Sequence, residues 1–187
     1  MSEDRLVATP SQTVGPYFRI GLAWLLRADV FGPGIGGPRR VVSGRVLDGD
    51  GEGVEDAVLE IWAADPAGRY PEAGHPPGND GFGRVATDPQ GAFSFTVVKP
   101  GPVPGPEGTR QAPHLAVTVF MRGLLRHLFT RVYFPDEGPA NAADPVLALV
   151  EPARRATILA RPDPADPAAL RWDVVLQGPR ETVFFDV

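Results

Sequence analysis

Histidine and tyrosine are the residues of this chain whose chemistry is easiest to assign, because both can bind a transition metal. The 187-residue sequence contains three of each. His114 opens the stretch HLAVTVF at 114–120, which we interpret as a strand. A second ligand on the same face would have to lie at position 116, because side chains at i and i+2 point the same way. That residue is Ala116, so the local spacing supplies one ligand and not two.

The other histidines do not complete a site by their spacing. His75 lies in the loop DPAGRYPEAGHPPGND at 65–80, and His127 follows Arg126 in a basic turn. We interpret both as surface or packing residues, and Tyr70 of the same loop likewise. No glycine-rich phosphate loop, nucleophile elbow or Ser/His/Asp arrangement is legible. The residues alone therefore predict an orphan histidine on a strand.

Composition excludes several other functions. The net charge of -5 argues against nucleic acid as a partner, because that partner requires clustered Lys and Arg. The absence of cysteine removes disulfides, thiolate nucleophiles and iron–sulfur clusters, and it makes the cytoplasm the default location. Acidic residues stand near the N-terminus where a signal peptide is basic, and the apolar run at 21–26 is too short to span a bilayer. We expect no membrane association.

The elements that must position these residues are predicted to be strands. The 22 glycines and 22 prolines are spread over turns between short apolar segments, which is typical of an all-β sandwich or barrel. We expect a single β-sandwich domain at 41–187 with few short helices, preceded by an extended N-terminal arm and loop at 1–40. Prolines in the arm lower the entropy lost on ordering, so we expect the arm to lie on another surface.

Turn signals and alternation place the individual strands. The turns DGDG at 48–51 and DPQG at 88–91 each predict a hairpin, the first joining 41–47 to 54–62 and the second joining 81–87 to 91–98. Alternation puts two groups on single faces, namely Leu59 with Ile61 and the presumed core set Phe93, Phe95 and Val97. We also expect closing strands at 157–160, 170–177 and 182–185, a helical turn at 145–150, and a rigid polar connector at 161–167.

Six segments together resemble the intradiol ring-cleaving dioxygenases. They are TPSQTVGPYF (9–18), LEIWAADPAGRY (59–70), GFGRVATDPQGAFSF (81–95), KPGP (99–102), APHLAVTVFMRGLLRHLFTRVYF (112–134) and LQGPRETVFFDV (176–187). The resemblance covers nearly the whole chain in the right order. It implies a β-sandwich that binds ferric iron through two tyrosines and two histidines and cleaves a catechol ring between its hydroxyls with O2.

The same resemblance implies that most of the iron ligands are missing here. The family's catalytic chain carries a Tyr after the KPGP element and an Arg-Pro-Ala-His-x-His run on the next strand. The corresponding places hold Val103, Gln111 and Ala116, and the other ligand tyrosine should fall at 71–80, where there is none. Only His114 is left, at a vestigial ligand position. We therefore predict no metal ligand set and no catalytic residue in this chain.

Some members of the family consist of two chains, α and β, which look like duplicates of which only β kept the metal. The resemblance implies that this is an α chain, with Fe(III) held by the partner β subunit. The active centre would lie at the α/β interface and accept a small aromatic dihydroxy acid and O2. The arm would wall that pocket with Thr13, Gly15, Pro16 and Tyr17.

A basic residue after the histidine strand is implied to attract the substrate carboxylate. Arg122 fits this role because a guanidinium pairs bidentately with a carboxylate, and Arg131 is a weaker candidate. Two alternatives stay open. A self-sufficient intradiol dioxygenase would need replacement ligands among His75, Tyr70, His127 and Tyr133. A noncatalytic binding module is also compatible, because the stretch at 42–62 resembles generic prealbumin-like sandwiches.

Overall fold

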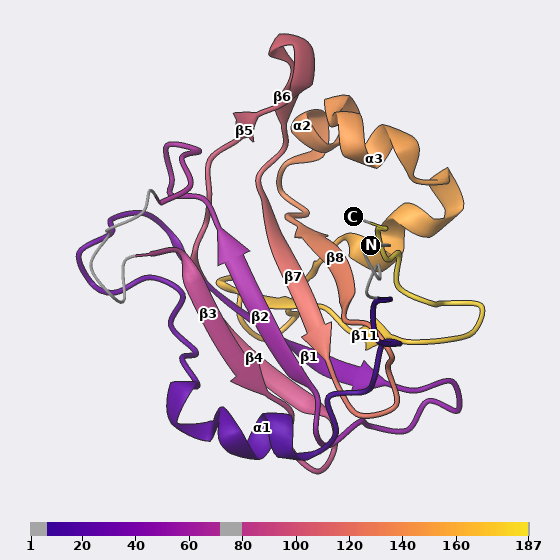
Figure 1. Cartoon of the computed structure of the whole chain (residues 1–187). Coiled ribbons are helices and arrows are strands. Elements are labelled where there is room, and N and C mark those ends of the chain that lie inside the picture. The colour runs from indigo at the N-terminus through magenta and orange to yellow at the C-terminus, as the bar shows by residue number, and fades with distance from the viewer. Residues whose placement is uncertain (1–6, 72–79, 187) are drawn as a thin grey trace, which may run out of the picture.

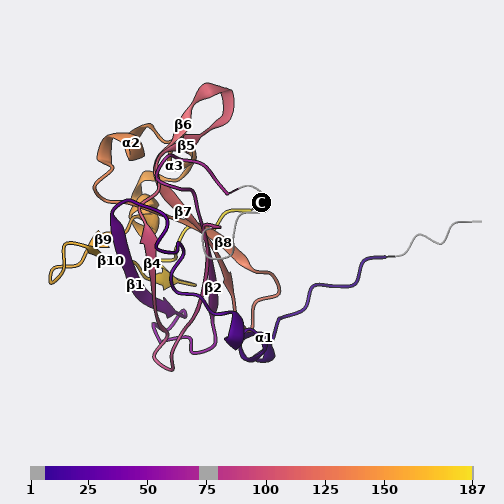
Figure 2. The same ribbon diagram turned by 90° about the vertical axis from the view of Figure 1, so that its left-hand side faces the viewer.

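The computed structural model describes residues 7–71 and 80–186, which form two facing β-sheets (Figures 1 and 2). The central strand of sheet I is β1 (Arg39–Leu47), which pairs antiparallel with β4 (Ala92–Val98). It also pairs parallel with β10 (Ala169–Arg171) and with β11 (Val174–Val175). The short strand β9 (Arg161–Pro162) pairs with β10. Sheet II has the antiparallel order β3 (Phe82–Ala86), β2 (Val58–Ala63), β7 (His114–Phe120) and β8 (Leu128–Tyr133). A separate ribbon joins β5 (Val103–Pro104) to β6 (Arg110–Gln111). The predicted all-β sandwich is confirmed.

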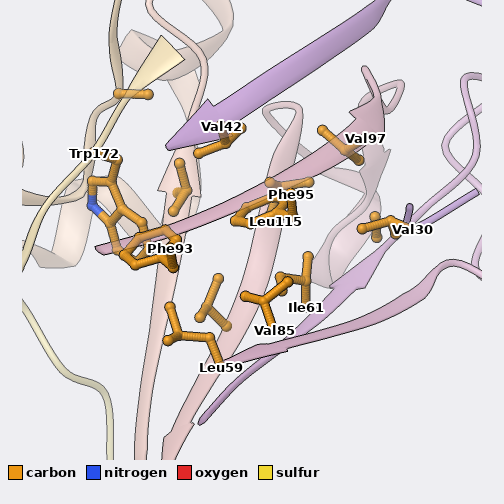
Figure 3. Packing of buried hydrophobic residues seen from close by; sticks show 14 of the residues in the cluster. Val30, Val42, Leu59, Ile61, Val85, Phe93, Phe95, Val97, Leu115 and Trp172 are labelled. Atoms are coloured by element: carbon orange, nitrogen blue, oxygen red, sulfur yellow. The ribbon is translucent and has the colours of Figure 1, made fainter. Parts of the chain in front are cut away.

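The core lies between the two sheets, where alternate residues of each strand point inward (Figure 3). Leu59 and Ile61 of β2 are fully buried, and Phe93, Phe95 and Val97 of β4 face them from sheet I. Both predicted alternations are confirmed. The core also takes in two residues of the N-terminal segment, Val30 and Phe31.

The two predicted hairpins are wrong, although both turns exist. Val54 N donates to Val46 O as in a hairpin, but β2 then pairs with β3 and β7 instead of β1. Asp88 likewise closes a tight turn by donating to Ala92 O, yet the strands on either side, β3 and β4, belong to different sheets. A tight turn reverses the chain equally well within one sheet or between two. Because the strands on both sides of each turn, β1 to β4, all bury one face, alternation could not distinguish these outcomes.

Short helices occupy the arm and the far end of the sandwich. In the arm lie α1 (Tyr17–Gly21) and the 3-10 helix η1 (Ala23–Leu25), which the sequence did not predict. The remaining ones are η2 (Pro106–Gly108), α2 (Gly138–Ala143), α3 (Pro145–Leu149) and η3 (Pro152–Ile158). The helical turn expected at 145–150 is confirmed as α3. It begins at Asp144, whose carboxylate accepts hydrogen bonds from Val146 N and Leu147 N.

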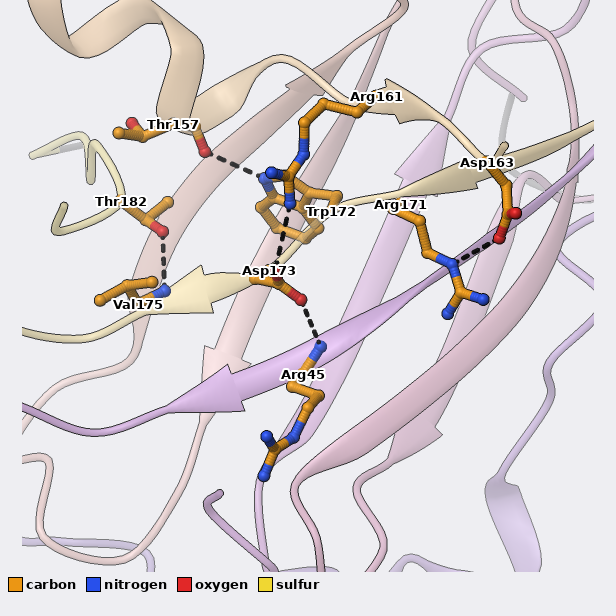
Figure 4. A network of polar contacts seen from close by, with 9 residues as sticks. All are labelled: Arg45, Thr157, Arg161, Asp163, Arg171, Trp172, Asp173, Val175 and Thr182. Atoms are coloured by element: carbon orange, nitrogen blue, oxygen red, sulfur yellow. Dashed lines mark hydrogen bonds and ion pairs between the residues drawn. The ribbon is translucent and has the colours of Figure 1, made fainter. Parts of the chain in front are cut away.

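The C-terminal part of the chain is less regular than predicted. The stretch expected as a strand at 157–160 is divided between the end of η3 and a single bridge of Leu159 with Tyr133, and 182–185 contributes a single bridge, Phe129 to Phe185. The stretch at 170–177 is divided into β10 and β11, because Trp172 turns its indole into the core and donates to Thr157 O (Figure 4). Gly44 of β1 makes room for this break, since a Cβ there would lie 1.7 Å from Trp172 O.

Side-chain contacts replace the missing ladder bonds in this region. Asp173 accepts from Arg45 N and pairs with Arg161, and Thr182 accepts from Val175 N (Figure 4). Local polar pairing of this kind cannot be deduced from hydrophobic periodicity. Within the described ranges, no helix is both long and apolar enough to cross a membrane.

Candidate functional site

His114 lies at the start of β7 on the outer face of sheet II. Its neighbours Leu115, Val117 and Val119 are fully buried in the core, so the alternate residues face away from it. The register places Tyr133 of β8 opposite His114 and Arg131 opposite Ala116. The place where a second histidine ligand would stand is therefore flanked by a guanidinium.

The imidazole of His114 is buried and hydrogen-bonded at both nitrogens. Nδ1 lies 2.8 Å from Ala112 O, and Nε2 lies 3.3 Å from the hydroxyl of Tyr70. A carbonyl only accepts, so Nδ1 carries the proton and Nε2 accepts from Tyr70. Burial and the nearby Arg131 lower the pKa of His114 to about 4, which keeps the ring neutral. His114 is thus satisfied by its own chain.

Around His114 the polar side chains form a connected cluster. Arg131 Nη1 donates to Gln111 Oε1 at 2.6 Å and lies 3.4 Å from the Tyr133 hydroxyl, which in turn donates to Asp144 Oδ1. Asp144 is completely buried, and its Oδ2 accepts from Ala112 N at 2.7 Å. We call these residues, His114, Tyr70, Gln111, Arg131, Tyr133 and Asp144, the histidine cluster.

The histidine cluster does not fit a ferric ion. Burial raises the pKa of the Tyr133 phenol, and partial burial raises that of Tyr70, so neither is readily the phenolate that Fe(III) prefers. The lone pair of His114 Nε2 is used by Tyr70, and the Arg131 charge repels a second cation. Val103, where the resemblance implies a tyrosine, is buried. In the described part of the chain no three His, Cys, Asp or Glu side chains gather as a metal site.

Of the two remaining histidines, the structure describes His127, which does not join this cluster. His127 is exposed, and its ring is tilted against that of Phe120 with centroids 5.5 Å apart, at the other end of β7. His75, and all but the edges of the loop at 71–80, lie outside the described residues. Of the three replacement ligands that the structure describes, Tyr70 and Tyr133 contact His114, and His127 does not.

The predicted arm residues gather around the turn that follows β7. Thr13 Oγ1 accepts from Gly123 N at 2.9 Å. Gly15 has φ 66°, a left-handed conformation that glycine adopts without strain, and Phe18 N donates back to its carbonyl. Pro16 lines a shallow pocket of about 250 Å³, and Tyr17 is 79% exposed. These residues therefore form one continuous surface segment.

Arg122 lies in the same shallow pocket as Pro16. Its Nε is 2.9 Å from Asp56 Oδ2 and its Nη2 is 3.2 Å from Glu55 Oε1, so one edge of the guanidinium is held by carboxylates of its own chain. Nη1 has no hydrogen-bond partner among the residues the structure describes. The geometry leaves the outer edge of Arg122 open to a further anion.

The structure separates the predicted residues into two groups. The arm and Arg122 lie at the Phe120 end of β7, as the 5.0 Å separation of the Phe18 and Phe120 rings indicates. His114 lies at the opposite end, six residues and therefore roughly 20 Å away. Thr13, Gly15, Pro16 and Tyr17 thus do not reach the histidine cluster of the same chain.

Sequence reasoning did not bring three members of the histidine cluster together with His114. Tyr70 was interpreted as a loop residue, or as a replacement ligand in the alternative of a self-sufficient enzyme. Arg131 was a weaker candidate for binding the carboxylate, and Asp144 was not considered. The Asp-Pro pair at 144–145 was a usable signal, because Asp before a proline that opens a helix is typical of an N-cap. No local signal links Tyr70 to His114, because their contact depends on the pairing of β2 with β7.

Comparison with known proteins gives a consistent result. Residues 25–178 match the family model described as Dioxygenase. The chain is 48% identical over 198 residues to the protocatechuate 3,4-dioxygenase alpha chain of Burkholderia cepacia, with 97% of this chain and 98% of that protein covered. It is 41% identical over 203 residues to the corresponding alpha chain of Pseudomonas putida, with both covered in full.

A beta chain and two solved structures are also similar. The protocatechuate 3,4-dioxygenase beta chain of Burkholderia cepacia is 33% identical over 155 residues, covering 76% of this chain and 66% of that one. The dioxygenase domain of a carbohydrate-binding fusion from Streptomyces sp. SirexAA-E has a TM-score of 0.64 at 24% identity, with 98% and 97% covered. The 3-chlorocatechol 1,2-dioxygenase of Rhodococcus opacus 1CP has a TM-score of 0.65 at 19% identity, with 92% and 68% covered.

The two solved structures show that the fold is shared. The family model and the two alpha chains show that the sequence similarity covers the whole sandwich. The expected family is thereby confirmed: the chain belongs to the intradiol ring-cleaving dioxygenases.

Proposed function

We propose that this chain is the noncatalytic α subunit of a protocatechuate 3,4-dioxygenase. The complete enzyme cleaves 3,4-dihydroxybenzoate with O2 to 3-carboxy-cis,cis-muconate. Fe(III) is held by the partner β subunit, and this chain completes the substrate pocket from outside. The proposal rests on similarity to two alpha chains over their full length, together with the donor set around His114, which does not fit ferric iron.

The observation that carries the proposal is the distance between the two groups of predicted residues. The arm residues Thr13, Gly15, Pro16 and Tyr17 lie with Arg122 at one end of β7, and His114 lies at the other. Substrate-binding residues placed so far from the chain's own cluster are explained if they serve the pocket of another chain. A beta-chain relative with 33% identity indicates that such a partner has the same fold.

Within this proposal, the residues of this chain act by binding and shape. Thr13 ties the arm to Gly123, so that the Gly15–Tyr17 stretch is presented as a wall of the partner's pocket. Arg122 attracts the substrate carboxylate with its open edge, while Glu55 and Asp56 hold the other edge in place. The uncharged wall and the cation together favour a small aromatic acid.

Iron content tests the division between the subunits. The chain expressed alone should contain no stoichiometric iron and show no activity. Coexpression with its β chain should give an iron-containing, coloured and active complex. Stoichiometric ferric iron with a phenolate-to-iron absorption band in the lone chain would overturn the proposal and favour a self-sufficient dioxygenase.

The alternative of a prealbumin-like binding module makes a different prediction. Such a module would leave the β chain equally active with or without this chain. The deciding measurement is the activity of the iron-loaded β chain before and after this chain is added. We expect activity on 3,4-dihydroxybenzoate to require both chains, because the substrate pocket is incomplete without the arm.

A further inference from the structure

A pocket of about 310 Å³ lies beside β9 and β11 of sheet I, on elements that carry neither the arm nor Arg122. Its walls come from these strands, from η3 and from the segment at 179–182. We call it the η3 pocket. It is lined mainly by Ala156, Leu159, Arg161, Trp172, Arg180 and Thr182. It shares no lining residue with the pocket around Arg122, so it is a separate feature of the molecule.

The floor of the η3 pocket is apolar and fixed in place. Trp172 is 2% exposed, and its indole Nε1 donates to Thr157 O at 3.1 Å (Figure 4). Leu159, another lining residue, is held by a bridge to Tyr133 of β8. Ala156 of η3 adds only a methyl group to the wall. A flat apolar group can therefore pack here without rearrangement of the protein, which limits the entropy lost on binding.

A buried hydroxyl lines the η3 pocket without a complete set of hydrogen bonds. It belongs to Thr182, which is a lining residue although it is only 1% exposed. Its Oγ1 accepts from Val175 N at 2.9 Å (Figure 4). A hydroxyl also has one hydrogen to donate, and no residue in the described ranges accepts it. Because buried donors in native proteins are nearly always paired, this hydroxyl indicates an acceptor that a ligand supplies.

Positive charge around the η3 pocket exceeds negative charge. Arg161 and Arg180 both line it, and Asp173 is the one acidic residue among the described residues that do so. Both oxygens of Asp173 are already engaged, because Oδ1 accepts from Arg45 N and Oδ2 lies 3.2 Å from Arg161 Nη2. Arg180 is exposed and forms no ion pair with any residue that the structure describes. The guanidinium of Arg180 would therefore attract an anion to the pocket.

We propose that the η3 pocket binds a small organic carboxylate with a flat apolar body, such as an aromatic acid. The apolar body packs against Trp172 and Leu159. The carboxylate accepts from the guanidinium of Arg180 and from the hydroxyl of Thr182, which are two residues apart in the chain. Arg161 adds a second positive charge beside them. This site goes beyond the proposed function, which does not require the η3 pocket.

The size and the chemistry of the η3 pocket favour a small acid over other ligands. Sites for small molecules range from about 300 to about 1,000 Å³, and the η3 pocket lies at the lower limit of this range. An inorganic anion would leave the apolar floor uncovered, and an uncharged aromatic molecule would leave Arg180 without a counter-charge. A molecule that carries both an apolar body and a carboxylate uses all of these features.

The test follows the indole N–H signal of Trp172 by NMR spectroscopy of the full, isotopically labelled chain, with sodium benzoate as the probe. The chain contains three tryptophans, so the variants Trp24→Phe and Trp62→Phe at the two exposed ones identify the signal of the third. The Trp172 signal should shift and saturate with a dissociation constant on the order of 1 mM, because so small a ligand makes few contacts. Benzamide and acetate each lack one of the two groups and should bind at least ~5-fold more weakly.

Two variants test the role of charge in the η3 pocket. Arg180→Gln should weaken benzoate binding about 5-fold or more, because it removes a charge from the lining of the pocket. Arg110→Gln on β6, also an exposed arginine but outside the pocket, is the matched control and should leave the dissociation constant unchanged. The remaining signals of each spectrum check that the fold is kept.

Three results would overturn the proposal. They are a Trp172 signal that does not shift at about ten times the expected dissociation constant, benzamide binding as tight as that of benzoate, and equal dissociation constants for Arg180→Gln and Arg110→Gln. None of them would contradict the assignment as an α subunit, because iron content and coexpression with the β chain test that assignment separately.

Discussion

The two ends of the outer face of sheet II contrast sharply. At one end His114, Tyr133 and Asp144 of the histidine cluster are buried, and the polar atoms of the cluster are hydrogen-bonded to one another or to the backbone. At the other end Tyr17 and Trp24 are about 80% exposed and contribute little to the chain's own core. One end is hydrogen-bonded within the chain, and under the proposed function the other is covered by a partner.

Under the proposed function, the difference would divide the work between two related chains. A metal centre needs ligand atoms whose lone pairs stay free until the ion binds. Here Arg131 and Gln111 lie in the same cluster as His114 and are hydrogen-bonded to each other. The buried end therefore contributes stability. The exposed end keeps apolar surface that costs solubility unless it is covered. Under the proposed function, stability belongs to one end and binding to the other.

The largest effect should come from Asp144→Ala in the histidine cluster. Asp144 caps α3 and accepts from Ala112 N, so its loss leaves several buried donors without a partner. We expect the free energy of unfolding to fall by about 3 kcal/mol, measured by urea denaturation. The surface variant Asp50→Ala should change it by less than about 0.5 kcal/mol. Similar losses in the free energy of unfolding for Asp144→Ala and Asp50→Ala would contradict the role in stability that we assign to the histidine cluster.

Acid should act on the same cluster through His114. Its pKa is about 4 in the folded chain against 6.5 when unfolded, so the unfolded state binds more protons between these values. The neutral His114 ring therefore contributes roughly 3 kcal/mol to the free energy of unfolding above pH 6.5, and this contribution is lost as the pH falls to about 4. Urea denaturation from pH 7 to 4 should show a shallower loss for His114→Gln than for wild type. His127→Gln, at the exposed end, should follow the wild-type curve.

Arg122→Ala tests the exposed end through the assembled enzyme. KM for 3,4-dihydroxybenzoate should rise by about 10-fold or more, because an ion pair in a partly closed site is lost. KM for an uncharged catechol should change much less, and Arg126→Ala, also on an exposed turn, should affect neither. If both substrates respond equally to Arg122→Ala, this guanidinium does not bind the carboxylate.

The smallest effect on stability is expected for Tyr17→Ala. Because Tyr17 is 79% exposed, its removal should change the free energy of unfolding of the full chain by less than about 0.5 kcal/mol. Steady-state kinetics of the assembled enzyme should nevertheless show a lower kcat/KM, since the arm walls the pocket in our proposal. A loss of stability without a kinetic change would reverse the roles assigned to the two ends.

Much of the sandwich could be predicted from local patterns. Alternation at Leu59 and Ile61 and at Phe93, Phe95 and Val97 identified the core faces, because a strand between two layers must bury every second residue. Strand pairing was not predictable in the same way. The turns at 48–51 and 88–91 reverse the chain, but the packing of whole sheets decides whether the next strand stays or crosses.

For the candidate site as well, some features followed from the sequence and others did not. That His114 has no second histidine beside it follows from the sequence alone, because Ala116 occupies the i+2 position. The short helices of the arm, α1 and η1, were not predicted, since segments this short are stabilised by contacts such as Phe18 with Phe120 more than by their own propensity.

The sequence by itself determined the fold class, the family resemblance and the absence of a second histidine two residues after His114, because each depends on residue types at fixed positions along the chain. Only the tertiary structure decided that Tyr70 reaches His114, that Arg131 stands opposite Ala116, and that the arm lies at the far end of β7. These contacts join residues distant in the chain. Their geometry depends on sheet register, which no local pattern encodes.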